Sequence, residues 1–311
     1  MKIGMIGTSI ISDQFADALG QISTFTKALV YSRNLHKAQE KQELWATEEA
    51  TDDFDVFLSS DIDVAYIASP NSLHFEQLMA CLKAGKNVIC EKPMILSLED
   101  FDAAYALADE KGLFLFEAFR HINSPNFTRL KEAIGEIGAI RYAHLVYGQH
   151  SSKYAAYKRG ENPNIFNPEF KGGALNDLGV YPIAVAVGLF GQWKSLTYKK
   201  ICLDNGVDAL GTIILEYNDF LCNIAFSKVS DSQNISEISG EEGGIVISRV
   251  GVLEGLYING QSESQNMLEN DMVYEAQNFL NIMQLNNQES YHALREISRL
   301  TCKVISEAKN L

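Results

Sequence analysis

A glycine-containing turn near the start of the sequence has the spacing of a phosphate-binding loop. Between a short apolar run and a helical pattern lies the segment Gly4-Met5-Ile6-Gly7-Thr8-Ser9-Ile10-Ile11-Ser12. In the G-x-G-x-x-G fingerprint, a pyrophosphate rests on free N–H groups at a helix N-terminus. Gly7 supplies the tight turn, whereas Ser9 and Ser12 replace the second and third glycines. The turn alone is therefore compatible with a dinucleotide site or with an ordinary strand-to-helix turn.

The residues after the second apolar run bear on the choice of cofactor. Ser32 and Arg33 directly follow the run from Ala28 to Tyr31. An acidic residue here would bind the ribose 2′-hydroxyl of NAD and repel a 2′-phosphate, whereas serine and arginine can bind that phosphate. The pair favours NADP(H), with NAD(H) possible. The alternative is a solvated arginine at a strand end.

Two further apolar runs end in residues that could act on a ligand. These residues are Ala68-Ser69-Pro70-Asn71-Ser72-Leu73-His74 and Glu91-Lys92-Pro93. In an open parallel sheet, ligands bind beyond the carboxyl ends of the strands. Pro93 restricts Lys92 to an extended backbone, and an ammonium at a buried strand end is costly to desolvate. We therefore expect Lys92 to have a function.

Strands that alternate with helices must position these turns. The expected strands are Ile3–Ile6, Ala28–Tyr31, Val64–Ile67, Asn87–Cys90 and Leu113–Phe116. Helical spacing occurs between them, and Ser97 is the expected N-cap of the last of these helices. Such alternation predicts an α/β domain over residues 1–119, with a doubly wound parallel sheet that is covered on both faces.

From residue 120 the pattern changes to strands separated by turns. The expected strands are 140–146, 212–217, 221–226, 235–238 and 245–252. They predict a C-terminal α+β domain over residues 120–311, with an open, largely antiparallel sheet. A helix at 127–134 precedes the strands, and helices at 272–283 and 291–309 end the chain.

Charge and cysteine content exclude several classes of protein. The chain has 311 residues, with 26 lysines and arginines against 40 aspartates and glutamates, a net charge of −14. Such a chain would be repelled by a nucleic acid backbone, so we expect no nucleic acid partner. Five cysteines without disulfide or zinc spacing indicate a reducing cytoplasm and no metal site. The longest uncharged run, near 178–190, is too short to span a bilayer, and no N-terminal leader pattern occurs.

Together these motifs resemble the glucose-fructose oxidoreductase / inositol dehydrogenase (Gfo/Idh/MocA) family. The matching segments occur in family order at Ile3–Thr8, Tyr31–Arg33, Ser69–His74, Ala84–Pro93 and Gly172–Pro182. The resemblance implies a Rossmann domain, a C-terminal domain with an open sheet that often makes subunit contacts, and a nicotinamide cofactor between them. An exposed sheet face in the C-terminal domain would suggest a homodimer or homotetramer formed through that sheet.

The resemblance assigns roles to individual residues. Lys92 matches the active-site lysine, and Asp177 matches the aspartate of the D-x-G-x-H motif. Tyr181 replaces the histidine of most members, as in the branch that resembles dihydrodiol dehydrogenases, where tyrosine is the expected proton donor. The cofactor site is implied at Gly7, Thr8, Ser9, Ile10, Ile11, Ser32, Arg33, Ser69, Pro70, Asn71, His74, Glu91 and Lys92.

The chemistry of these side chains agrees with the assignment. Reduction of a carbonyl needs a hydride and a proton, and Tyr181 could donate the proton. A free tyrosine has a pKa of about 10, and a nearby Lys92 ammonium would favour the phenolate. Asp177 precedes Tyr181 by four residues, which would place both on one face if the segment is helical. Pro182 indicates that the pair lies near a helix start.

The expected substrate is a small polyol, sugar derivative or dihydrodiol-like compound, oxidised at a CH–OH group or reduced at a carbonyl. Candidate substrate contacts are Phe119, Arg120 and His121 after the last Rossmann strand, and Asn162 in the irregular stretch 150–171. One alternative is a non-catalytic, dinucleotide-sensing regulator on the same fold. Another is a reductase that never releases its cofactor.

Overall fold

The chain forms two compact units in the computed structural model, which describes residues 1–265 and 267–311. Met1–Ala118 and Leu268–Arg295 make up the first unit, and Phe119–Met267 and Glu296–Leu311 make up the second. The end of the first segment lies one residue before the division predicted after residue 119. Leu268–Arg295, predicted in the C-terminal domain, instead packs with the first unit.

A parallel sheet is the centre of the first unit. Its strands are β1 (Lys2–Ile6), β2 (Thr26–Tyr31), β3 (Glu49–Thr51), β4 (Val64–Ile67), β5 (Asn87–Glu91) and β6 (Leu115–Ala118). The six strands lie in the order β3-β2-β1-β4-β5-β6, and every pairing is parallel. All four residues of β4 are fully buried, as a strand covered on both faces requires. The predicted doubly wound α/β architecture is confirmed.

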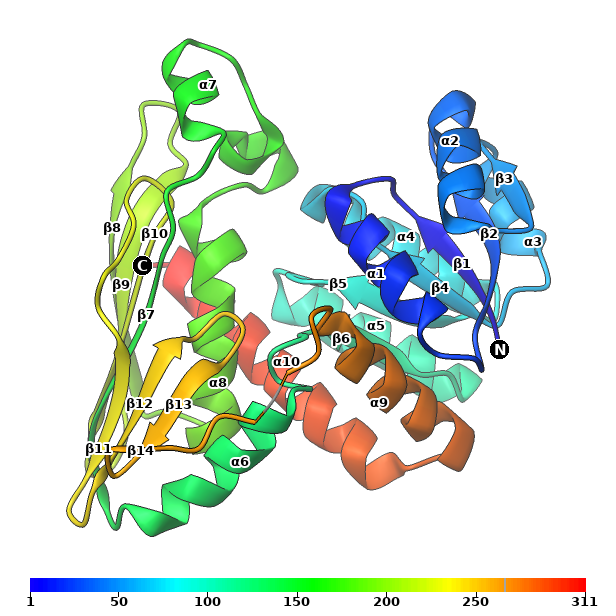
Figure 1. The fold of residues 1–311 in the computed structure, drawn as a ribbon. Helices are drawn as coiled ribbons and strands as arrows, with labels where there is room; N and C mark the ends of the chain where they lie inside the picture. The colour runs from blue at the N-terminus through cyan, green and yellow to red at the C-terminus, as the bar shows by residue number, and fades with distance from the viewer. Residues whose placement is uncertain (266) are drawn as a thin grey trace. The chain divides into compact units, whose positions relative to one another are not determined.

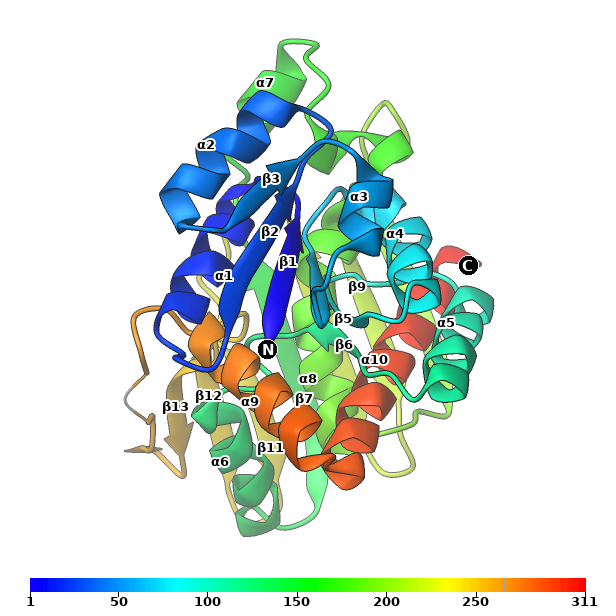
Figure 2. The same ribbon diagram turned by 90° about the vertical axis from the view of Figure 1, so that its right-hand side faces the viewer.

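Helices cover both faces of this sheet. They are α1 (Ile10–Gly20), α2 (Leu35–Trp45), α3 (Phe54–Ser59), α4 (Asn71–Lys83), α5 (Leu98–Lys111) and α9 (Met272–Leu285). In Figure 2, α1, α2 and α9 lie on one side of the sheet, and α3, α4 and α5 lie on the other. Ser97 caps α5 as predicted, because its side chain accepts a hydrogen bond from the Asp100 N–H. Phe279 of α9 stacks on Phe116 of β6 with 4.5 Å between ring centroids, which explains why this late helix belongs to the first unit.

The second unit is built on a mixed sheet of eight strands. They are β7 (Ile140–Gly148), β8 (Ser195–Cys202), β9 (Asp208–Glu216), β10 (Leu221–Ser227), β11 (Ser236–Gly240), β12 (Gly244–Arg249), β13 (Glu254–Ile258) and β14 (Gln261–Ser262). Their order is β14-β13-β12-β11-β7-β10-β9-β8. The β7–β10 pair is parallel and the other pairs are antiparallel, so the prediction of a largely antiparallel sheet is confirmed.

One face of this sheet packs on helices. The helices of the unit are α6 (Pro125–Ala133), α7 (Tyr154–Lys158) and α8 (Val180–Phe190), and α10 (Gln288–Lys309) contributes residues to both units. Figure 1 shows α8 along the sheet. In β9 and β10, buried residues such as Ile213, Leu215, Ile224 and Phe226 alternate with more exposed ones. This alternation separates a packed face from an outer face.

The segment before α8 is helical but irregular. A π-helical turn, η4 (Leu175–Gly179), runs directly into α8. Within the described residues, the helical stretch Pro168–Phe190 is long and apolar enough to cross a membrane, but 78% of its most apolar window is buried inside the structure. Such burial is typical of the core helix of a globular protein.

Candidate active site

Gly7 has a backbone conformation and surroundings that only glycine tolerates. Its φ is +106°, and a Cβ at this position would lie 2.5 Å from the carbonyl oxygen of Ala68, just after β4. Its N–H donates to the Tyr31 carbonyl at the end of β2, at 3.2 Å. The turn after β1 therefore packs directly against the ends of both neighbouring strands, which a side chain would prevent.

Ser9 begins the helix that follows this turn. It is the N-cap residue of α1 and has an extended backbone, but its side chain accepts no capping hydrogen bond. Its Oγ lies 3.3 Å from the Oγ of Ser12, which is fully buried. Because the first N–H groups of a helix have no partner within the helix, this N-terminus keeps the character of an anion site. Ile10, beside it, is 77% exposed.

Ser32 and Arg33 lie at the carboxyl end of β2. The Ser32 N–H donates to the Thr51 carbonyl of β3 at 3.1 Å, and its Oγ is 3.4 Å from the Asn34 N–H. The side chain of Arg33 is exposed. These contacts fix the backbone at the strand end and leave a hydroxyl and a guanidinium at the position that the sequence predicted for the ribose and its phosphate.

His74 connects the loops after β4 and β5. The buried imidazole has Nδ1 2.9 Å from the Pro93 carbonyl oxygen and Nε2 2.8 Å from the Ser69 carbonyl oxygen. A neutral ring carries one N–H and donates to only one of them. Burial lowers the pKa of His74, and the smaller effect of the two carbonyl oxygens opposes it. His74 therefore lies between Ser69 and the Lys92 turn as a structural link rather than as an exposed group.

Buried carboxylates support the backbone of the Lys92 turn. Glu91 accepts from the Tyr66 hydroxyl at 2.9 Å and from the Lys92 N–H at 3.3 Å, and Glu117 accepts from the Met94 N–H at 2.8 Å. Burial, reinforced by Glu91, raises the pKa of Tyr66 well above its usual value, so this hydroxyl stays a donor. The half-buried Lys92 is thus held by hydrogen bonds on both sides of its peptide to Pro93, which is cis.

Asp177 and Tyr181 lie in the second unit, where the π-helical turn meets α8. Asp177 belongs to η4, and Tyr181 is the second residue of α8, followed by Pro182 in its first turn. Tyr181 lies near the start of the regular α-helix, as predicted, but the π-helical turn extends the helix back to Leu175. Gly179 between them packs against β10, because a Cβ there would lie 3.0 Å from the ring of Phe226.

Aromatic side chains of the same unit surround Tyr181. The Nε2 of His121 lies 3.1 Å from the Tyr181 carbonyl oxygen, and the ring centroids are 4.9 Å apart. Tyr147 of β7 meets the Tyr181 ring edge-on at 5.5 Å. His121 is fully buried and Phe119 packs edge-on against it, whereas Arg120 is half-buried. His121 therefore contacts Tyr181 directly, and Phe119 contacts the ring of His121.

Lys228 is a residue of this region that the sequence analysis missed. It directly follows β10, is buried, and forms an ion pair with the Asp177 carboxylate. A sequence signal existed, because Cys222, Ile224, Phe226 and Lys228 occur at alternate positions. A strand buries every second residue on one face, so this alternation places Lys228 inward.

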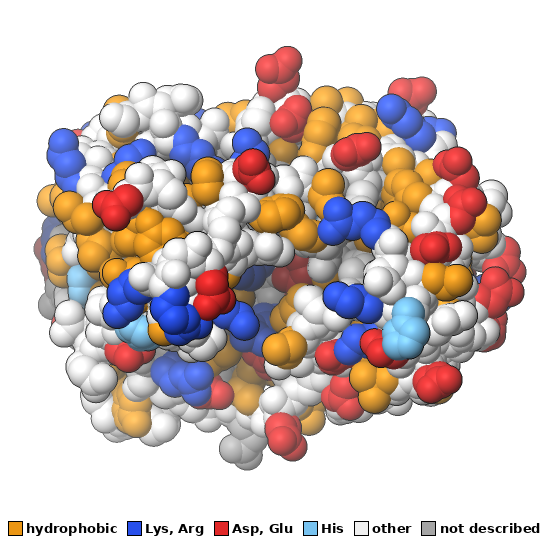
Figure 3. Space-filling model, turned by 90° about the horizontal axis from the view of Figure 1, so that it is seen from above, with side chains coloured by type: hydrophobic (Ala, Val, Ile, Leu, Met, Phe, Trp, Pro, Cys, Tyr) orange, Lys and Arg blue, Asp and Glu red, His pale blue; other side chains and the backbone are white. Residues whose placement is uncertain are grey.

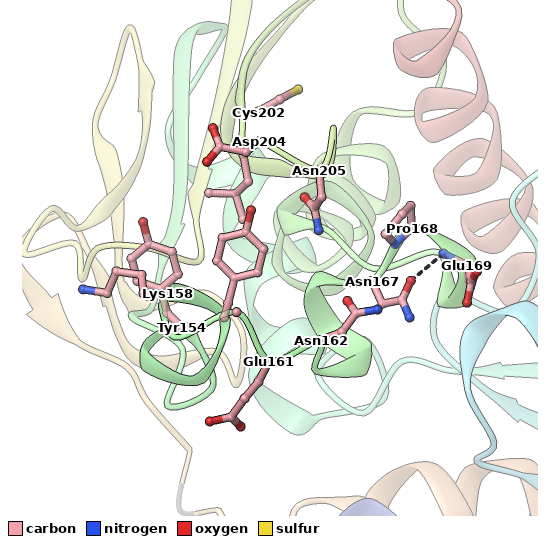
Figure 4. A pocket seen from close by; sticks show the side chains of 13 residues that line it. Tyr154, Lys158, Glu161, Asn162, Asn167, Pro168, Glu169, Cys202, Asp204 and Asn205 are labelled. Carbon is pink, nitrogen blue, oxygen red and sulfur yellow. Dashed lines mark hydrogen bonds between the residues drawn. The ribbon is translucent and has the colours of Figure 1, made fainter.

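A pocket of about 840 Å³ in the second unit includes Asn162, the fourth predicted substrate contact. Tyr154 and Tyr157 stack with 6.2 Å between centroids, and Phe166 packs against both rings. Asn167 accepts from the Glu169 N–H at 2.9 Å (Figure 4). The pocket is lined by Tyr154, Tyr157, Lys158, Gly160, Glu161, Asn162, Asn167, Pro168, Glu169, Cys202, Leu203, Asp204 and Asn205. Lys92, Asp177 and Tyr181 are not among them, so the predicted catalytic residues do not line this pocket.

Models of known families match both halves of the chain. Residues 1–119 match a model described as an oxidoreductase family with an NAD-binding Rossmann fold. Residues 127–246 match the GFO/IDH/MocA C-terminal domain.

Several known proteins are similar along nearly the whole chain. An uncharacterized oxidoreductase of Escherichia coli is 38% identical over 99% of this chain and 95% of its own. The NADP(+)-dependent scyllo-inositol 2-dehydrogenase of Bacillus subtilis is 36% identical over 99% of this chain and 96% of its own. A 3-ketoreductase from Actinomadura kijaniata, crystallised with NADP and TDP-benzene, superposes with a TM-score of 0.84 at 21% identity, over 100% of this chain and 97% of that one.

Proposed function

This chain belongs to the GFO/IDH/MocA family of NAD(P)-binding oxidoreductases, and on that premise we propose that it is an NADP(H)-preferring enzyme for small polyols or sugar derivatives. It would transfer a hydride between the nicotinamide and a CH–OH or carbonyl group. The similarity to an NADP(+)-dependent inositol dehydrogenase supports both the cofactor and the substrate class.

The observation that carries the proposal is the placement of chemically suited residues along one edge of the parallel sheet. Gly7, Ser32, Ser69 and Lys92 follow β1, β2, β4 and β5, which are neighbours in the order β2-β1-β4-β5. Ligands of open α/β sheets bind beyond these carboxyl ends, where the strand order reverses. The helix N-terminus at Ser9 fits a pyrophosphate, and Ser32 with Arg33 fits a 2′-phosphate.

The second unit would supply the proton chemistry. When bound, the nicotinamide supplies or accepts the hydride. We assign the proton transfer to the Tyr181 hydroxyl, on a ring that His121 and Tyr147 hold in place. The Asp177 carboxylate would accept a hydrogen bond from a substrate hydroxyl. The Lys92 ammonium would stabilise the negative charge that develops on the substrate oxygen.

A steady-state screen tests this proposal. Purified protein is mixed with NADP⁺ or NAD⁺ and a panel of cyclic polyols, aldoses and a trans-dihydrodiol, and formation of reduced nicotinamide is followed by absorbance. We expect turnover of at least one polyol or sugar with NADP⁺. No turnover of any panel member, together with no binding of NADPH or NADH in a fluorescence titration, would contradict the proposal.

Tyr181→Phe tests the proton-donor assignment within the same assay. Removing one hydroxyl should lower kcat by about 100-fold, in the range of general acid–base contributions. The dissociation constant for NADPH should stay unchanged, because Tyr181 lies outside the unit that carries the phosphate turn. Tyr147→Phe is the matched control, since it removes a hydroxyl from the neighbouring ring. Equal kcat in wild type and Tyr181→Phe would refute the assignment.

A further inference from the structure

A buried lysine faces the Asp177 carboxylate from the sheet of the second unit. The Lys228 side chain is 3% exposed, and the Asp177 side chain with which it forms an ion pair is 29% exposed. A buried ammonium needs a partner, because its desolvation is otherwise uncompensated. The carboxylate, in contrast, still reaches solvent on one side. The pair therefore has an inner, cationic end and an outer, anionic end.

The structure fixes the cationic end in several ways. The Lys228 backbone N–H donates to the Ala209 carbonyl at 2.9 Å, and its carbonyl accepts from the Ser151 N–H at 2.9 Å. Its ammonium also lies 6.0 Å from the centroid of the Phe166 ring, within the range of a cation–π contact. The backbone of Lys228 is therefore anchored in the second unit, and its ammonium extends from this anchored position to the Asp177 carboxylate.

The π-helical turn is attached to the same sheet by its backbone. The Asp177 N–H donates to the Gly173 carbonyl at 3.2 Å, and the Leu175 N–H donates to the Asp208 carboxylate of β9 at 2.6 Å. Gly179 packs on the Phe226 ring of β10, two residues before Lys228. These contacts hold the backbone of the turn, and the ion pair with Lys228 restrains the Asp177 side chain.

We propose that Lys228 is a positioning residue of the active site, whose ammonium sets the direction of the Asp177 carboxylate towards the substrate. The inference rests on the proposed function, in which Asp177 accepts a hydrogen bond from a substrate hydroxyl. Lys228 itself is buried and acts through Asp177. Because orientation errors of about 1 Å can lower rates about 100-fold, loss of this ammonium has a measurable kinetic consequence.

A double-mutant cycle on kcat/KM tests the proposal in the full-length protein. We expect Lys228→Met to lower kcat/KM for the polyol by about 10-fold to 100-fold, with the NADPH dissociation constant unchanged. Lys228→Arg keeps the charge and should recover most of the loss. In the Asp177→Asn background, Lys228→Met should add little, because the carboxylate that it positions is gone. Lys200→Met, at an exposed lysine that lies over Tyr198 in the same sheet, is the matched control and should leave kcat/KM unchanged.

The possible outcomes distinguish a failure of the inference about Lys228 from a failure of the proposed function. Wild-type turnover combined with an unchanged kcat/KM in Lys228→Met would overturn the inference alone, even if the melting temperature falls, because the ion pair would then be structural. Fully additive losses in the double variant would overturn it as well. If Lys228→Met does not fold, Lys228→Arg and Lys228→Gln take its place, and equal kcat/KM in these two would contradict a role for the charge. No turnover by the wild type would overturn the proposed function and the inference together.

Discussion

The burial of His74 couples the stability of the first unit to pH. Burial lowers its pKa below the 6.5 of a free imidazole, so the unfolded chain binds a proton that the folded chain does not. Below pH 6.5 the unfolded state therefore holds more protons, and stability decreases as the pH falls towards the folded pKa. We predict that the free energy of unfolding in urea falls from neutral pH to about pH 5, the range in which histidine titrates, and that His74→Gln removes part of this decrease.

His36 provides a control for this prediction. It lies on the surface of α2, with its side chain 81% exposed. His36→Gln is the matched substitution, and its unfolding is measured beside that of His74→Gln. If the free energy of unfolding has the same slope against pH in the wild type and in His74→Gln, the His74 ring binds its proton equally in the folded and unfolded states. That result would contradict the prediction.

Functional residues were predictable from the sequence where a turn requires a particular residue type. Gly7 was identified by its spacing, and the structure gives the reason in its positive φ and its contact with Ala68. The roles of Glu91 and His74 in supporting the Lys92 turn were not predictable, because they depend on which backbone groups lie beside them in the fold. Lys228 was missed because a lysine directly after a strand is usually solvated.

At the scale of elements, the π-helical turn η4 depends on the absence of a side chain at Gly179. A Cβ would lie 3.0 Å from Phe226, so Gly179→Ala forces the ring or the turn to shift. Overpacking typically costs about 1–3 kcal/mol, whereas alanine improves helix propensity by about 1 kcal/mol. We predict a net loss of about 1 kcal/mol in urea unfolding, together with a lower kcat because Asp177 and Tyr181 flank this position.

A second substitution separates the packing cost of Gly179→Ala from its gain in helix propensity. Phe226→Leu replaces the ring that opposes the new methyl group with a smaller side chain. It should therefore restore part of the lost stability in the Gly179→Ala background, whereas it should not stabilise the wild type. A Gly179→Ala protein more stable than the wild type would show that the ring moves aside at no cost, and that the close contact does not hold η4 in place.

Elements with a clear apolar pattern were predictable from the sequence, whereas weakly patterned ones were not. The strands β1, β4 and β5 and the helices α9 and α10 were predicted within a few residues of their ends. The sequence predicted neither β3, which has three residues, nor α3, which has six. It also missed β8, an edge strand of the sheet in which most side chains are exposed, so apolar alternation is absent.

For the whole molecule, the division into units followed from the change in pattern near residue 119, but the return of Leu268–Arg295 to the first unit did not. That return depends on aromatic contacts between distant segments, such as Phe116 with Phe279 and with Tyr291. The net negative charge of the chain arises from side chains on its surface. Figure 3 shows acidic side chains interspersed with lysines and arginines on the face that it draws. In the proposed function, binding of an anionic cofactor would depend on local donors such as Arg33 and Lys92.

The outer face of the eight-stranded sheet leads to a prediction about assembly. Tyr142 of β7 and Leu221 of β10 are register partners and are 42% and 47% exposed, and Ile214 of β9 is 39% exposed. We propose that this face forms a homodimer or homotetramer, as apolar side chains gathered on one surface favour association. Light scattering after gel filtration should give a mass above that of one chain, and Leu221→Glu should reduce it. A monomeric wild type would contradict the proposal.

We propose that the first unit binds NADP(H) in preference to NAD(H), and a fluorescence titration with NADPH and NADH measures this preference. We expect the wild type to bind NADPH about 10-fold more tightly than NADH, as a charged hydrogen bond to the 2′-phosphate would give. We also expect that Arg33→Ala removes most of this difference while NADH binding stays the same. Equal or tighter binding of NADH by the wild type would contradict the proposal.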